Sequence, residues 1–344
     1  MLKRIILYIV FLSVGLGVLF WIIKFLNWVE AKTVFYMFFS WQGAVLFGLI
    51  IMVKLSGIWK WQFILKTQGY NFPFGKIGKI WLASSTIDYL TPVALFGGDF
   101  FRIYTLKKFF PSISWEKSIA SDLIDKICDL TIIFFIVVIG LIYFTFFNPF
   151  LPSKIIFVFL GIIVLFTAIF VFFYFKSHKK ESILDLFFKI FGIKKEKLLK
   201  NGNGKVFLGA EEEVLNFFDT KKAFFWKGIG LTVFKYLLVL VLIIFLLYFL
   251  TGSFNVLKAS AIFSFVDLAY LTPVPMGLGS LEAFQSFAFH SFGLGAEIGI
   301  SFSLIFRGLE ILVNLVGIIF LVTLGIRLAT MRLTDLVEKI SKQD

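Results

Sequence analysis

The stretch Leu271-Thr-Pro-Val-Pro-Met-Gly-Leu-Gly-Ser-Leu-Glu282 interrupts a hydrophobic run with two prolines and two glycines. A similar stretch lies far upstream, Leu90-Thr-Pro-Val-Ala-Leu-Phe-Gly-Gly-Asp-Phe-Phe-Arg102. When Tyr89 is aligned with Tyr270, the run Tyr-Leu-Thr-Pro-Val is identical in both copies, and Gly98 falls on Gly279 without a gap. Because prolines remove backbone donors and glycines loosen a helix, each stretch is expected to be helical at both ends and open between them. Two such interruptions at corresponding places indicate a transporter's substrate site.

Composition places the chain in a membrane. Hydrophobic residues make up 59% of it, 49 residues are Phe, and the mean hydropathy is +0.95, all far above a typical soluble domain. The net charge of +13 does not indicate nucleic acid, because the lysines cluster between apolar runs, as in cytoplasmic loops that face anionic headgroups. The single cysteine, Cys128, excludes an intrachain disulfide and is expected to be a small buried hydrophobe.

The apolar runs predict six membrane crossings. The first is expected to be a retained helix rather than a signal peptide, because it is long enough to span and no small-x-small cleavage site follows it. After the second crossing, a lysine-rich segment is expected to lie at the cytoplasmic interface, with Lys54, Lys60, Lys66, Lys76 and Lys79. The six expected crossings are Ile5 to Phe25, Val34 to Val53, Ile119 to Phe147, Ile155 to Phe175, Ile229 to Leu250 and Ala296 to Leu324.

The two broken stretches are expected to be re-entrant hairpins that enter from opposite sides. The first has basic flanks on both sides and should therefore dip from the cytoplasm. The second, from Val256 to Phe292, has only Lys258 as a flanking cation and should dip from outside. With this arrangement the positive-inside rule is satisfied throughout, and it predicts a multi-pass protein of the inner (cytoplasmic) membrane with both termini in the cytoplasm.

The largest polar segment, residues 176–228, is expected to be a solvated cytoplasmic loop. It contains an amphipathic helix with a stripe from Ile183 to Phe191, suited to lying on the membrane surface, and a turn at residues 201–204. The last residues, 329–344, are expected to form a cytoplasmic tail.

The predicted fold is all-α, a polytopic inverted repeat with three spanning helices and one re-entrant hairpin per half. The halves, residues 1–150 and 151–328, form a single membrane domain of residues 1–344. The same alignment places Lys126 on Arg307 and Asp129 on Glu310, a cation followed by an acid on one helix face of each third crossing. Such a repeat is a transporter architecture whose site lies near the midplane.

Charged residues inside a membrane are costly and need partners or a function. For Lys126 with Asp129 and Arg307 with Glu310, two interpretations stay open. Each pair either staples crossings together or lines a polar path, where cations meet phosphate and carboxylates meet an amine. Lys235 is expected to snorkel toward its helix end.

Asp99 and Ser280 each follow a glycine and are expected to N-cap the next helix, aiming a positive helix end at a phosphate. Glu282, in one of those first turns, is the competing internal partner for that helix end.

Three motifs resemble the lysylphosphatidylglycerol synthase transmembrane region, a flippase-like membrane domain. They are the Thr-Pro…Gly-Gly-Asp-x2-Arg run at Thr91 to Arg102, the Pro-x-Pro-x-Gly-x-Gly-x2-Glu run at Pro273 to Glu282, and the charged positions Asp125, Lys126, Arg307 and Glu310. The family usually has arginine where this chain has Lys126, which keeps the charge but not the bidentate geometry.

The resemblance implies translocation of a lipid, such as an aminoacylated phospholipid, between leaflets. The soluble domain that makes this lipid in bifunctional relatives is expected to be absent, so we expect no enzyme activity.

The substrate-binding residues expected from these motifs lie in the two broken stretches and in the third crossing of each half. No catalytic residue, metal or cofactor is expected. The partners are expected to be the membrane lipid, anionic headgroups and an enzyme that makes or uses the lipid, and not nucleic acid. The expected substrate-binding residues are Thr91, Pro92, Gly97, Gly98, Asp99, Arg102, Asp125, Lys126, Asp129, Thr272, Pro273, Pro275, Gly277, Gly279, Glu282, Arg307 and Glu310.

The favoured substrate is an anionic or zwitterionic lipid, including a phospholipid or a polyprenyl-phosphate carrier. Two alternatives stay open. One is an accessory or scaffold subunit of an envelope enzyme, which would not require paired charges inside a repeat. The other is an intramembrane lipid transferase, disfavoured because His178 and His290 have no ligand spacing around them. His290 is expected to serve packing.

Overall fold

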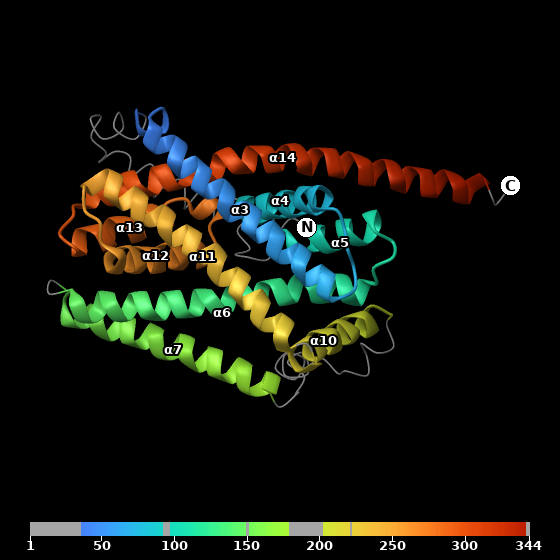
Figure 1. Cartoon of the computed structure of the whole chain (residues 1–344), viewed down its shortest axis with the longest axis horizontal. Helices are drawn as coiled ribbons and strands as arrows, with labels where there is room; N and C mark the ends of the chain where they lie inside the picture. The colour runs from blue at the N-terminus through green and yellow to red at the C-terminus, as the bar shows by residue number, and fades with distance from the viewer. Residues whose placement is uncertain (1–35, 92–96, 149–150, 179–201, 221, 342–344) are drawn as a thin grey trace, which may run out of the picture.

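The structure is a computed structural model that describes residues 36–91, 97–148, 151–178, 202–220 and 222–341 (Figure 1). All regular structure in these ranges is helical, which confirms the predicted all-α class. Five of the described helices are long and apolar enough to cross a membrane, so the chain is a multi-pass membrane protein. These five are α3 (Trp41–Thr67), α6 (Trp115–Phe147), α7 (Ser153–His178), α11 (Lys222–Thr251) and α14 (Ala296–Ser341).

The bounds of these helices differ from those of the predicted crossings, and the first predicted crossing, 5–25, lies outside the described residues. The second crossing, predicted to end at Val53, is α3, which continues through Lys54 and Lys60 to Thr67. The fifth, α11, begins at Lys222 rather than at Ile229, and α14 continues to Ser341 instead of ending at Leu324. Hydropathy therefore locates the spans but does not predict where a helix ends when its terminal turns contain charged residues.

Both broken stretches are flanked by helices, as predicted. The upstream pair consists of α4 (Phe74–Leu90) and α5 (Asp99–Phe109). Residues 92–96 between them, with Pro92, lie outside the described residues. The downstream pair consists of α12 (Val256–Leu271) and α13 (Ser280–Ser291), joined through a short 3-10 turn, η1 (Pro275–Gly277).

The downstream break has a left-handed backbone at its centre. Met276, Gly277 and Gly279 have φ angles of 59°, 60° and 77°, a region that glycine enters without the steric cost of a Cβ atom. The helices after the breaks begin with glycine caps, Gly98 for α5 and Gly279 for α13. The prediction that Asp99 and Ser280 are the N-caps is therefore wrong by one residue, because each is already the first helical residue.

The helices that carry the breaks pack against the long helices of the opposite part of the chain. Helix α4 lies against α14, α12 lies against α6, and α3 lies against α11. In Figure 1, α12 and α13 lie near the left end of the molecule, whereas α4 and α5 lie nearer its middle, on the side toward the C-terminus. Residues distant in sequence are thereby brought to the centre of the molecule.

Small residues allow these helices to approach closely. A Cβ atom on Gly317 of α14 would come within 1.9 Å of the Thr86 hydroxyl and 2.9 Å of the Leu82 carbonyl on α4. A Cβ atom on Gly140 of α6 would come within 1.8 Å of the Ser264 hydroxyl on α12. Close backbone approach at small residues is a main source of helix association in membranes.

We expect Gly317→Leu to destabilise the protein by roughly 1 to 3 kcal/mol, because the added side chain must push α4 away from α14. Unfolding of the detergent-solubilised protein during a titration with SDS measures this. Gly325→Leu is the matched control, since it lies on the same helix and its Cβ atom would meet nothing within 4 Å. Equal losses for both variants would contradict the close contact.

The segment between α7 and α11 is only partly solvated. Helix α10 (Gly202–Thr220) packs against α6, and its Val214 and Phe217 are buried in one cluster with Ile124. The prediction of a solvated loop is therefore wrong for residues 202–220, and so is the predicted turn where it is described, since residues 202–204 open α10. Short polar residues and glycine are tolerated in a first helical turn. The predicted amphipathic stripe from Ile183 to Phe191 lies outside the described residues.

Candidate functional site

A buried arginine joins α5 to the start of α6. Arg102 pairs with Asp122 and, at 3.0 Å, with Asp125, while its guanidinium lies 4.9 Å from the centre of the Trp61 ring. All three charged side chains are almost completely buried. Because an uncompensated charge would be very costly here, the two carboxylates and the aromatic face are what allow the arginine to be present.

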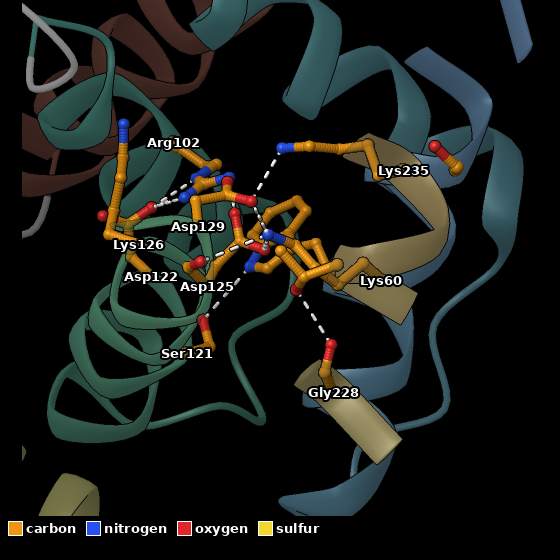
Figure 2. A network of polar contacts seen from close by, with 12 residues as sticks. Lys60, Arg102, Ser121, Asp122, Asp125, Lys126, Asp129, Gly228 and Lys235 are labelled. Atoms are coloured by element: carbon orange, nitrogen blue, oxygen red, sulfur yellow. Dashed lines mark hydrogen bonds and ion pairs between the residues drawn. The ribbon is translucent and has the colours of Figure 1, made fainter. Parts of the chain in front are cut away.

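Two lysines from different helices share the next acid of α6. Lys60 of α3 lies 2.9 Å from Asp125 and 2.7 Å from Asp129, and Lys235 of α11 also lies 2.7 Å from Asp129. Figure 2 shows these side chains converging on α6 from the opposite side to Arg102. Cys128, in the same helix, is buried and unpaired with any other cysteine, as expected.

Lys126 of α6, the cation that aligns with Arg307, lies close to the first break. Its ammonium lies 3.1 Å from Asp99, the first residue of α5, and 3.8 Å from Asp88 near the end of α4. Asp88 in turn accepts a 2.8 Å hydrogen bond from the backbone N–H of the cap residue Gly98. A cation on α6 therefore holds both sides of the upstream break.

The corresponding cation in the downstream part, Arg307 of α14, holds the second break. It forms a bidentate pair with Glu282, whose second contact measures 2.8 Å, and donates a 2.8 Å hydrogen bond to the carbonyl of Gly277. Glu282 also accepts a 2.9 Å bond from the N–H of the cap residue Gly279. The α13 helix end is thus partnered by the protein itself, in agreement with the internal alternative for Glu282.

The acids one turn further on pair with lysines from the opposite part of the chain. Glu310 of α14 lies 2.7 Å from Lys54 of α3, and Asp129 of α6 lies 2.7 Å from Lys235 of α11. Lys54 and Lys235 are 181 positions apart, and so are Asp129 and Glu310. One sequence offset therefore relates two ion pairs, each of which joins residues 1–150 to residues 151–328.

Many of these residues line a cavity of about 290 Å³, which we call the central cavity because eight helical elements contribute to it. Its wall includes residues from α3, α4, α5, α6, α11, α12, η1 and α14. The volume is near the lower end for small-ligand sites, which suits a headgroup rather than a whole lipid. The charged side chains in its wall are Lys54, Asp88, Arg102, Asp125, Lys126, Asp129, Lys235, Asp267 and Glu310.

Several polar atoms in the cavity wall have no hydrogen-bond partner among the described residues. They are the hydroxyls of Tyr89, Tyr270 and Thr91 and one carboxylate oxygen of Asp267. Buried polar groups are nearly always satisfied, so a group of orphans around one cavity marks a place where a polar ligand or water can bind. Tyr89 and Tyr270 are also the aligned tyrosines of the two broken stretches.

Apart from Pro92, which lies outside the described residues, the expected site residues divide into two groups. Those in the cavity wall are Thr91, Arg102, Asp125, Lys126, Asp129, Thr272, Gly277 and Glu310. The others are not in the wall but belong to the two broken stretches or contact them: Gly97, Gly98, Asp99, Pro273, Pro275, Gly279, Glu282 and Arg307. Sequence reasoning missed the wall residues Lys54, Asp88, Tyr89, Lys235, Asp267 and Tyr270 as site residues. The offset of 181 positions would have pointed to the two lysines and the two tyrosines.

Three expectations about single residues are wrong. Lys54 and Lys60 are not interface lysines but partly and fully buried members of ion pairs inside the helix bundle. Lys235 does not snorkel, because Asp129 neutralises it within the bundle. His290 is exposed at the end of α13 rather than packed.

The described part of the chain is thus a polytopic α-helical membrane protein with a charged, partly unsatisfied cavity at the meeting point of broken helices. The chain belongs to the family described as the lysylphosphatidylglycerol synthase TM region, which it matches over residues 5–317. No curated protein and no solved structure matches the chain.

Proposed function

We propose that the protein translocates an anionic or zwitterionic lipid between the two leaflets, with the headgroup passing through the central cavity. The observation that carries this proposal is the cavity itself, a charged chamber with orphan hydroxyls that contacts helices from both parts of the chain. The family to which the chain belongs agrees with a role in lipid biology. Ionisable residues inside a membrane protein are by default candidates for a functional site, including a substrate path.

The wall chemistry fits a phosphate that carries a polar substituent. Lys54, Lys126 and Lys235 supply ammonium donors, and the hydroxyls of Tyr89 and Tyr270 supply neutral ones. The free carboxylate oxygen of Asp267 can accept from a hydroxyl or an amine of the headgroup. A phospholipid or its aminoacylated form satisfies both requirements, and so does a polyprenyl phosphate with a glycosyl group.

We further propose that residues 1–150 and 151–328 are inverted repeats and that the two broken stretches are re-entrant hairpins entering from opposite sides of the inner membrane. The reciprocal packing of α4 on α14 and of α12 on α6 supports this, as does the separation of the two helix pairs along the long axis in Figure 1. In such a protein, alternating access is a rocking of one half against the other around a fixed site. Both termini are then cytoplasmic.

In this mechanism two reciprocal ion pairs hold the halves together and must weaken when the halves move: Lys54 with Glu310 and Lys235 with Asp129. A phosphate in the cavity competes with the carboxylates for the lysines, which weakens the pairs and releases the halves. No partner enzyme is required for exchange, although one that makes or uses the lipid would supply a gradient of substrate.

Leaflet exchange of a fluorescent phosphatidylglycerol in proteoliposomes, read by dithionite quenching of the outer leaflet, tests the proposal. We expect Lys126→Gln to slow exchange roughly 10- to 100-fold, since a hydrogen bond to a charged group contributes about 1.5 to 3 kcal/mol. Lys126→Arg should retain most of the activity because it keeps the charge.

Lys154→Gln, an exposed lysine at the start of α7, is the control for loss of a positive charge and should leave the rate unchanged. If Lys126→Gln exchanges lipid as fast as the parent, the cavity is not the path. If the parent protein is no faster than empty vesicles, across phosphatidylglycerol and its lysylated form, an accessory role becomes the better explanation.

A further inference from the structure

A second cavity, of about 240 Å³, lies between α6 and α7. We call it the α6–α7 pocket. Its wall is almost entirely hydrocarbon and consists of Ile127, Leu130, Thr131, Ile133, Phe134, Phe166, Ile169, Phe170, Tyr174 and Leu271. It differs sharply from the central cavity, whose wall carries charged residues from many helices.

The two cavities adjoin each other. Leu130 and Ile133 of α6 belong to both walls. Leu271, the last residue of α12, contributes to the pocket, and the next residue, Thr272, contributes to the central cavity. A ligand that leaves the charged cavity past this face of α6 therefore enters hydrocarbon surroundings at once.

The polar atoms in the pocket are already paired with each other or with the backbone. The hydroxyls of Thr131 and Tyr174 lie 2.6 Å apart, and Thr131 also donates to the carbonyl of Ile127 at 2.6 Å. Phe134 of α6 and Phe170 of α7 stack face to face with their ring centres 3.9 Å apart, so an aromatic pair joins the two helices in the wall. The pocket thus offers an apolar surface to a hydrocarbon chain.

We propose that the α6–α7 pocket holds a hydrocarbon chain of the lipid whose headgroup occupies the central cavity, an inference that rests on the proposed function. An amphiphile is the ligand class that matches one charged and one apolar cavity sharing a wall. Because bilayer hydrocarbon is as apolar as the pocket, the free energy of chain binding comes from van der Waals packing against the wall and not from leaving water. The pocket acts by position, keeping the chain beside α6 while the headgroup crosses.

The pocket is open to modification without touching the charged site. Ile169 of α7 is 60% exposed and forms part of the pocket wall, so Ile169→Trp adds bulk where the chain is expected to lie. Val164, on the same helix, is 67% exposed and is not part of the wall, which makes Val164→Trp the matched control.

Two ligands separate the pocket from the cavity in binding measurements on the detergent-solubilised protein. Dioleoyl phosphatidylglycerol carries headgroup and chains, whereas glycerophosphoglycerol is the same headgroup without chains. We expect Ile169→Trp to weaken dioleoyl phosphatidylglycerol about tenfold and to leave glycerophosphoglycerol unchanged, with Val164→Trp altering neither. Equal affinities of both variants for the long-chain lipid would overturn the pocket proposal while leaving the headgroup site intact.

Photo-crosslinking supplies a measurement that needs no substitution. Phosphatidylglycerol with a diazirine in its acyl chain should label Phe166, Ile169 and Phe170 above Val164, and this preference should disappear with an acyl-diazirine diacylglycerol that lacks the phosphate. The same ratio for both probes would show ordinary contact with bulk lipid and would overturn the proposal. If the parent protein binds neither glycerophosphoglycerol nor any of the phospholipid probes, both the pocket and the headgroup site fail.

Discussion

Replacing Arg307 with alanine is expected to lower the free energy of unfolding by about 3 to 5 kcal/mol, the cost of removing one partner of a buried ion pair. The loss is large because Glu282 is fully buried and Arg307 is the cation that pairs with it among the described residues. Arg307 also donates to the Gly277 carbonyl, so the turn between α12 and α13 loses its anchor on α14. Unfolding of the solubilised protein with SDS measures the effect.

Arg327→Ala is the control, since Arg327 lies on the same helix but is exposed. The double variant Arg307→Met with Glu282→Leu separates the cost of an unpaired buried charge from the contribution of the hydrogen bonds to the backbone of the break. It removes both charges with similar volumes and should therefore recover much of the loss. It should still remain about 1 to 2 kcal/mol below the parent, because the N–H of Gly279 loses its partner and the carbonyl of Gly277 keeps only the hydrogen bond from the Ser280 hydroxyl. A fully restored double variant would show that the backbone contacts contribute nothing.

The same contacts explain why the breaks could be located from the sequence while their caps could not. Prolines and glycines in a hydrophobic run are a local signal, and both breaks lie where they are expected. Which residue caps the helix depends on which side chain can accept a hydrogen bond from its backbone N–H group. Gly98 is fixed by Asp88 from the preceding helix, and Gly279 is fixed by Glu282 from its own first turn. Glycine also admits the close approach of α5 to α4, where a Cβ atom on Gly98 would lie 2.0 Å from the Ser84 carbonyl.

Charged residues were harder to assign, because their partners are distant in sequence. Lys54 was expected at an interface since it follows an apolar run, yet its acceptor on Glu310 is 256 positions away. Lys60 lies within the same helix and is neutralised by two acids of α6. Hydropathy treats each lysine as a cost, whereas a lysine with a partner inside the bundle allows the helix to continue. The acids of the third crossings, Asp129 and Glu310, could be predicted because the alignment of the broken stretches also places them on each other.

The reciprocal ion pairs give the sharpest expected difference between two similar substitutions. Lys54→Glu places a second carboxylate beside Glu310 in a mostly buried position, so it should abolish leaflet exchange, a loss of more than about 100-fold if the pair is worth about 3 kcal/mol. Reversing the pair with Lys54→Glu and Glu310→Lys restores the attraction. We expect this double variant to regain most of the exchange rate in the proteoliposome assay.

The other pair should not be reversible in this way, even though the 181-position offset relates the two. Asp129 also meets Lys60, which lies 2.7 Å away and is 1% exposed, so Asp129→Lys would bring two buried ammonium groups together whatever residue 235 becomes. Lys235→Glu with Asp129→Lys is therefore expected to stay inactive, while Lys54→Glu with Glu310→Lys recovers. Recovery of both double variants would mean that Lys60 does not hold Asp129. Failure of both would mean that the two pairs do more than attract each other, because the groups must then meet the headgroup with their native signs.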